Sequence, residues 1–96
     1  ANTTELLKLI SSMRETAAQF PEDIRDGIIY DIEAVEVEVN KPEKERDNPK
    51  LKTILKRIVA TSLAIAIPIA GMTDFADKAI DVGQKLGIEL KLPSGR

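Results

Sequence analysis

The chain contains neither cysteine nor histidine, and this double absence excludes most reactive side-chain chemistry. Without cysteine there can be no disulfide, no thiolate nucleophile and no zinc–thiolate site. Without histidine the commonest general base near neutral pH and the commonest metal ligand are missing as well. The serines therefore have no imidazole to activate them. We expect no catalytic residue, no cofactor, no small-molecule substrate and no enzymatic activity.

Aromatic residues are almost as scarce, since Phe20, Tyr30 and Phe75 are the only three. We expect both phenylalanines to point inward and Tyr30 to be a half-buried packing residue. Proteins that bind single-stranded nucleic acid usually stack bases on aromatic side chains. Because the isoelectric point is also only about 5.2, nucleic acid is not the partner we expect.

Carboxylate pairs offer the remaining route to a metal site. Asp74, Asp77 and Asp81 share one helical face, and Glu33 and Glu36 form a similar pair. Di-iron helical bundles use Glu-x-x-His pairs, however, and calcium loops use an Asp-rich loop with a central glycine. Neither pattern occurs here, so we expect no metal site.

The chain also lacks a hydrophobic run long enough to cross a bilayer. Its apolar stretch Ile58–Ala70 carries no charge, is thirteen residues long and contains Pro68, whereas a spanning helix needs about 20 apolar residues. We interpret this stretch as a buried helix, in the core of this chain or shared with a second subunit or the parent protein. The alternative is a membrane-docking or membrane-inserting segment.

Hydrophobic spacing of three and four residues predicts helices over about 3–19, 21–39, 49–70 and 74–86. The polar segment 40–48 is the predicted loop. Pro21 suits the first turn of the second helix, and Asn48 should cap the third with Pro49 following it. Thr73 or Asp74 should cap the fourth.

These elements predict an all-α fold: a single small bundle of four helices built as two helical hairpins. Pro68 and Gly71 should kink and end the third helix. Gly87 should end the fourth, and the alternating Ile88–Leu92 should lie as a short extended tail. Eight residues of the first and third helices are the candidates for core or interface: Leu6, Ile10, Met13, Leu55, Ile58, Ser62, Ile65 and Ile69.

The net charge of −2 conceals strong segregation. Residues 1–40 carry nine acids and three bases, whereas residues 41–57 carry seven bases and three acids. An antiparallel hairpin would set Asp31, Glu33, Glu36 and Glu38 beside the basic start of the third helix. The alternative is an anion-binding patch for phosphate or nucleic acid, formed by Lys50, Lys52, Lys56 and Arg57.

Three segments carry a family resemblance: ELLKLISSMRETAAQFPEDIRD (5–26), VNKPEKERDNPKLKTILKRIVA (39–60) and TDFADKAIDVGQKLGIEL (73–90). Together they resemble the C-terminal helical domains of uncharacterised cyanobacterial proteins, some of which carry pentapeptide-repeat or other modules. The resemblance covers most of the chain and transfers no catalytic or binding residue. It implies an accessory module of a larger bacterial protein.

The first residue is Ala1, and no basic segment followed by an apolar one opens the chain. We therefore expect a fragment of a longer, cytoplasmic protein. Its expected function is that of a non-enzymatic protein-interaction or oligomerisation module, with self-association or docking to the parent protein as the expected partnership.

Overall fold

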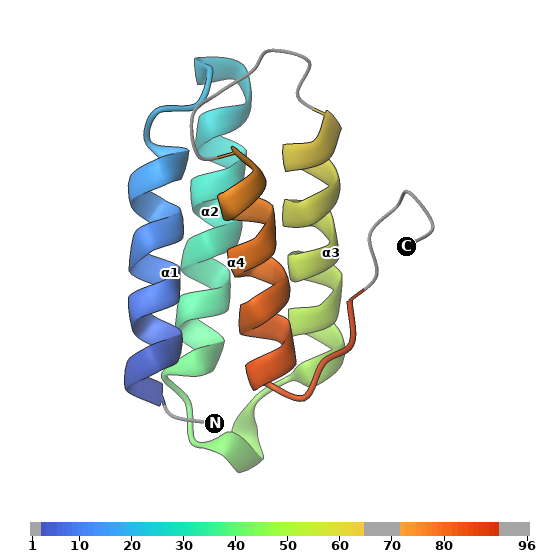
Figure 1. The fold of residues 1–96 in the computed structure, drawn as a ribbon. Coiled ribbons are helices and arrows are strands. Elements are labelled where there is room, and N and C mark those ends of the chain that lie inside the picture. Colours follow the sequence, from blue (N-terminus) through green and yellow to red (C-terminus); the bar gives the residue numbers. More distant parts are fainter. Residues whose placement is uncertain (1–2, 65–71, 91–96) are drawn as a thin grey trace.

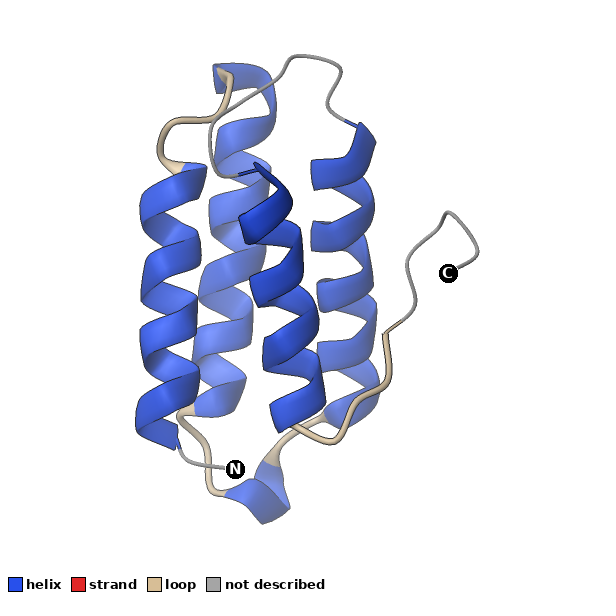
Figure 2. Ribbon diagram, in the orientation of Figure 1, coloured by secondary structure: helices blue, strands red, loops and turns tan. Residues whose placement is uncertain are grey.

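The computed structural model of the protein is an antiparallel ring of four helices (Figure 1), and it describes residues 3–64 and 72–90. The helices are α1 (Thr3–Ala17), α2 (Glu22–Val39), α3 (Asn48–Ala64) and α4 (Met72–Lys85). Each packs on the next, and α4 returns to pack on α1. Within the described ranges all regular structure is helical (Figure 2), which confirms the all-α bundle.

The core consists of the apolar stripes that the sequence predicts. Leu6, Ile10 and Met13 of α1 are buried, and so are Leu55 and Ile58 of α3. The remaining members of the core come from all four helices and the connections between them: Ala17, Phe20, Ile28, Ile32, Val35, Val39, Leu51, Ile54, Val59, Phe75, Ala79, Val82 and Ile88. Burial of this apolar surface is the main force that holds the ring together.

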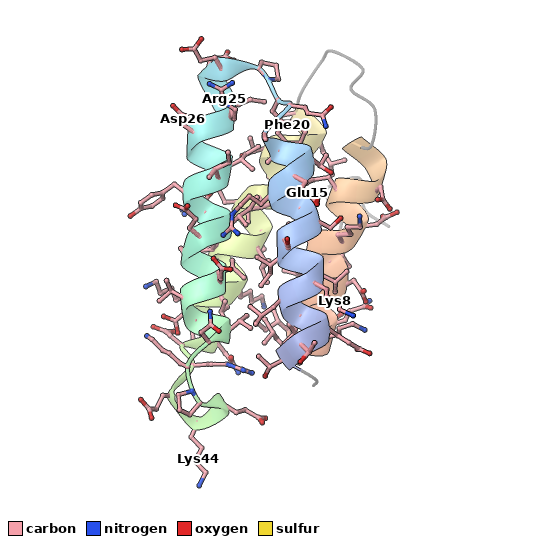
Figure 3. The ribbon with its side chains drawn as sticks, turned by 90° about the vertical axis from the view of Figure 1, so that its left-hand side faces the viewer. Lys8, Glu15, Phe20, Arg25, Asp26 and Lys44 are labelled. Atoms are coloured by element: carbon pink, nitrogen blue, oxygen red, sulfur yellow. The ribbon has the colours of Figure 1, made fainter. Side chains whose placement is uncertain are left out.

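An aromatic pair closes the end of the core at the α1–α2 turn. Phe20 follows α1 (Figure 3) and meets Phe75 of α4 edge to face, with ring centroids 5.0 Å apart. Both rings are almost fully buried. Edge-to-face contacts of this kind add about 0.5–1.5 kcal/mol to the effect of burial alone. Both phenylalanines therefore point inward, as the sequence predicts.

The helix ends differ from the predicted ones in small ways. α1 ends at Ala17 because the chain tightens into a turn, in which Phe20 N–H donates to the Ala17 carbonyl. Pro21 is the residue before α2 and not part of its first turn. α4 begins at Met72, so the predicted start at Thr73 or Asp74 was wrong.

The connection between α2 and α3 contains a short 3-10 helix, η1 (Glu43–Glu45), where the sequence predicts only loop. Asp47, and not Asn48, caps α3. The Asp47 carboxylate accepts from Lys50 N–H at 3.0 Å, and the Asp47 carbonyl accepts from Leu51 N–H. The prediction for Pro68 and Gly71 falls on residues outside the described part of the chain.

The end of α4 is a Schellman motif. Ile88 N–H donates to the Gly83 carbonyl at 2.7 Å, and Gly87 N–H donates to the Gln84 carbonyl at 3.0 Å. Gly87 has φ of +78°, which a side chain would disfavour. The chain then folds back so that Ile88 is buried and Leu90 covers Gly83. Residues 88–90 thus lie against the bundle, and residues 91 and 92 of the predicted tail fall outside the described part of the chain.

Two glycines give opposite expectations for the same substitution. A Cβ would meet no atom within 4 Å at Gly27 or at Gly87, so backbone conformation alone separates them. Gly27→Ala removes a glycine from a helix interior and should raise the free energy of unfolding by about 0.5–1 kcal/mol. Gly87→Ala should lower it by about 1 kcal/mol because φ is positive there. Urea titration of both variants checks this, and an equal effect at the two positions would contradict it.

Candidate interaction surface

Two carboxylates of α2 fix how α2 lies against α3. The first is Asp31, which is 7% exposed. It accepts two hydrogen bonds from Arg57 of α3, from Nε at 2.9 Å and from Nη2 at 2.8 Å. This two-point pairing sets the rotation as well as the distance of the two helices. The hydrogen bond from Arg57 to Asp31 also raises the pKa of the guanidinium above its already high ordinary value.

The second carboxylate, Glu38, is 1% exposed and has two hydrogen-bond donors and a further ammonium group around it, where α2 meets the connection to α3. Lys41 Nζ lies 2.8 Å from Oε2, Asp47 N–H donates to Oε1 at 2.9 Å, and Lys50 Nζ lies 3.8 Å from Oε2. Because Asp47 also caps α3, Glu38 holds the residue that starts the next helix. A single side chain thus joins the end of α2, the connection and the start of α3.

Arg46 also holds the connection between α2 and α3 in place through hydrogen bonds. Its Nη2 donates to the Val39 carbonyl at 2.7 Å, which satisfies a group left unpaired at the end of α2. Its Nε donates to the Lys41 carbonyl at 3.2 Å. Nη2 also reaches Thr3 Oγ1 at 3.5 Å, so the connection touches the start of α1.

The Glu38 cluster makes stability depend on pH. The hydrogen bond from Lys41, followed by that from Asp47 N–H, lowers the pKa of Glu38 below its ordinary value of 4.5. The same hydrogen bond raises the pKa of Lys41 above 10.5. The stabilisation from ionised Glu38 is therefore complete above the unfolded-state pKa and is lost as pH falls through the lower folded-state value. The contribution of Lys41 is lost only as pH rises through its raised value.

We expect Glu38→Gln to be less stable than the wild type at pH 7 and to approach it as the pH falls through the lowered folded-state pKa of Glu38, where the carboxylate itself becomes protonated. Urea midpoints of both proteins across this range test the expectation. Glu43→Gln, which changes an exposed carboxylate in η1, is the matched control and should show no such convergence. A gap between Glu38→Gln and wild type that stays constant with pH would show that the carboxylate charge contributes nothing.

The outer face shared by α2 and α3, which we call the α2/α3 face, carries unusual apolar exposure. Tyr30 is 71% exposed and Val37, two helical turns further on, is 59% exposed. The prediction that Tyr30 is half-buried was therefore wrong. Tyr30 is next to the core stripe of α2 in the sequence, but its side chain lies on the outer surface of the helix.

Two shallow hollows flank the Asp31–Arg57 pair on this face. One has a volume of about 360 Å³ and is lined by Tyr30, Asp31, Arg57 and residues nearer the start of α2, among them Gly27. The other has a volume of about 380 Å³ and is lined by the same three residues with Ala34, Lys50, Thr53 and Ile54. Tyr30, Asp31 and Arg57 line both hollows and therefore lie between them.

The predicted core residues that the structure describes are not accessible to a partner. Leu6, Ile10, Met13, Leu55, Ile58 and Ser62 are all buried within this chain. The Ser62 hydroxyl is satisfied by the Val59 carbonyl at 2.8 Å. Ile65 and Ile69 lie outside the described residues. Of the uncharged stretch, Ala60, Leu63 and Ala64 are exposed, so α3 is not buried on every side as its composition suggested.

The four candidate anion-binding residues have different surroundings in the structure. Arg57 is bound to Asp31, and Lys50 lies near Glu38. Lys52 and Lys56 are exposed and have no ion-pair partner among the described residues. The expected pairing of α2 acids with α3 bases is thus correct for Asp31 and Glu38. It is wrong for Glu36, which pairs with Arg14 of α1, and for Glu33, which has no ion-pair partner among the described residues.

The carboxylates that the sequence singles out do not form a metal site within the described residues. Asp74 and Asp81 pair with Lys78 and Lys85 along α4. Across residues 3–64 and 72–90, no three carboxylates gather closely enough to hold a metal ion. None of the helices in those ranges is both long and apolar enough to cross a membrane.

Comparison with protein-family models, curated proteins and solved structures gives no match for this chain. The α2/α3 face is therefore described from its own geometry. Sequence reasoning missed the face because it interprets Tyr30 as a packing residue and does not single out Val37. The available signal was a second stripe on that helix, formed by Gly27, Tyr30, Ala34 and Val37 at spacings of three and four residues.

Proposed function

We propose that this chain is a non-enzymatic protein-interaction module that docks through the α2/α3 face. It would act in the cytoplasm as part of a longer bacterial protein, as the resemblance to cyanobacterial helical domains implies. The observation that carries the proposal is the exposure of Tyr30 between two hollows, next to the Arg57 guanidinium. Tyrosine and arginine are the residue types that contribute most to binding energy at protein interfaces.

The rigidity of the face supports the same proposal. Asp31 and Glu38 fix α2 against α3, so a partner would meet a surface that is already in its final arrangement. Binding to such a surface costs less conformational entropy than binding to mobile loops. The apolar groups of this face also do little for the fold, because Tyr30 and Val37 are mostly in solvent.

The alternative functions have less support from the described residues. Anion binding would need several free cations together, but the Arg57 fork is already occupied by Asp31. Membrane docking would rest on Ile58–Ala70, of which the structure describes only the first seven residues, and most of these are core or small. Both alternatives remain predictions from the sequence.

A photo-crosslinking amino acid placed at position 30 tests the proposal directly. We expect irradiation to join position 30 to a polypeptide whose contact site can be mapped by mass spectrometry of the adduct. The same group at Glu15, an exposed position of α1 (Figure 3), is the matched control and should give no such adduct. If position 30 gives no more protein adduct than position 15 in cells that contain the whole parent protein, the proposal is wrong.

A further inference from the structure

We infer that the α2/α3 face takes an amphipathic α-helix of its partner, with a basic residue toward one end of that helix and an acidic residue toward the other. The inference rests on the proposed function, since it names the occupant of the same face. Its basis is the charge that the two hollows leave uncompensated, together with the geometry of their walls.

The two hollows carry opposite charge. Asp31 and Arg57 line both of them and cancel each other. Among the other described residues of the walls, the hollow nearer the start of α2 has one charged side chain, Asp23, and the hollow nearer the connection has one, Lys50. We call them the Asp23 hollow and the Lys50 hollow. Because α2 and α3 are antiparallel (Figure 1), the face is negative at one end and positive at the other.

Both charges are available to a partner. Asp23 is exposed and has no ion-pair partner in the ranges that the structure describes. The Lys50 side chain is 54% exposed and lies 3.8 Å from Glu38. Glu38 already accepts a hydrogen bond from Lys41 at 2.8 Å, so the charge of Lys50 is only partly compensated. A partner with a base at the Asp23 hollow and an acid at the Lys50 hollow therefore fits this face, and the reverse arrangement is disfavoured.

The walls of the hollows favour a helical partner over an extended one. They consist mostly of middle turns of α2 and α3, whose backbone N–H and C=O groups are bonded within their own helices. A segment that lies against them has to satisfy its own backbone groups, as a helix in a groove does. A small molecule is less suited, because sites for small molecules enclose most of the ligand and these hollows are shallow.

The hollows also set the spacing of the partner's apolar side chains. Gly27 lines the Asp23 hollow and Ala34 lines the Lys50 hollow. The seven residues between them correspond to about 10 Å along α2. Each has a small side chain or none, so each leaves room for one side chain of the partner. Two apolar residues seven positions apart on the partner helix would enter the two hollows with Tyr30 between them.

The charged positions continue the same spacing. Asp23 lies four residues before Gly27, and Lys50 lies beside Glu38, four residues after Ala34. The partner's basic residue should therefore lie four positions beyond one apolar residue, and its acidic residue four positions beyond the other. All four side chains then share one face of a helix, with the two charges about 22 Å apart.

Three synthetic peptides with this spacing test the inference by fluorescence anisotropy. Each has about 20 residues, enough to form a helix, and carries leucine at the two apolar positions. The charged positions hold lysine and glutamate in the mixed peptide, two lysines in the second and two glutamates in the third. The wild-type chain should bind the mixed peptide roughly fivefold more tightly than either of the others, because each of these places a like charge at one hollow.

Variants of the chain show whether the peptides use this face. Tyr30→Ala should weaken binding of the mixed peptide roughly tenfold, whereas Glu15→Lys, on the exposed side of α1, should leave it unchanged. Asp23→Lys makes both ends of the face positive, so the peptide with two glutamates should become the tightest. Lys50→Glu should give the opposite preference. Circular dichroism confirms that each variant folds, and binding of its preferred peptide shows that its face still works.

Other outcomes contradict the inference. It is overturned if none of the peptides binds at millimolar concentration, or if the order of the three affinities is the same in wild type and in Asp23→Lys. The crosslinking experiment separates the two proposals. An adduct from position 30 to an extended segment, or to the α2/α3 face of a second copy, overturns the helix and leaves the interaction module standing. The absence of any adduct overturns both.

Discussion

The structure depends most on the Glu38 carboxylate, because one buried charge decides where α2 ends, how the chain turns and where α3 begins. Burying a charge is unfavourable unless it is paired and hydrogen-bonded. Lys41 and the Asp47 N–H supply hydrogen bonds from the connection, and Lys50 adds a positive charge from the start of α3. Any other path for the connection would leave Glu38 buried without them. We therefore regard Glu38 as a determinant of register more than a source of stability.

Asp31 acts on the same helix pair about two turns further from the connection. Its two-point contact with Arg57 fixes the faces that α2 and α3 turn toward each other. Because Asp31 and Glu38 fix the sides of α2 and α3 that face each other, the sides of the two helices that face outward are fixed as well. The position of Tyr30 on the outer surface is thus a consequence of ion pairs that lie partly beneath it. Apolar residues of about the right size are enough to hold helices together, whereas directional contacts such as these specify one arrangement.

The sequence predicted the elements and the core well because both follow from spacing alone. The stripe of α1 is buried at every predicted position, and the break at Phe20 and Pro21 is where a proline requires it. Gly87 ends α4 in the positive-φ conformation that favours glycine. Val35–Val39 alternates valine with glutamate, a pattern that a strand would also show, but it is helical as predicted, and Val37 lies on the surface while Val35 and Val39 are buried.

The remaining features could not be predicted from the sequence, because they depend on where residues lie in three dimensions. Charge counting predicted that α2 acids would meet α3 bases, but it could not show that Glu38 reaches into the core or that Glu36 turns to α1. Asp47, and not Asn48, is the cap because its N–H is held by Glu38 across the connection, and the spacing of apolar residues carries no sign of that contact. Tyr30 was assigned to packing because it lies next to a buried stripe in sequence. Only the rotation of α2 against α3 shows that it faces outward.

Amide hydrogen exchange at Asp47 in the wild type and in Glu38→Gln tests the central claim most directly, because the Asp47 N–H donates to the Glu38 carboxylate. We predict that exchange becomes faster in the variant at Asp47 and at Lys50, whose N–H donates to the Asp47 cap, while the amides of α1 keep their wild-type rates. Equal rates at Asp47 and Lys50 in the two proteins would contradict the account.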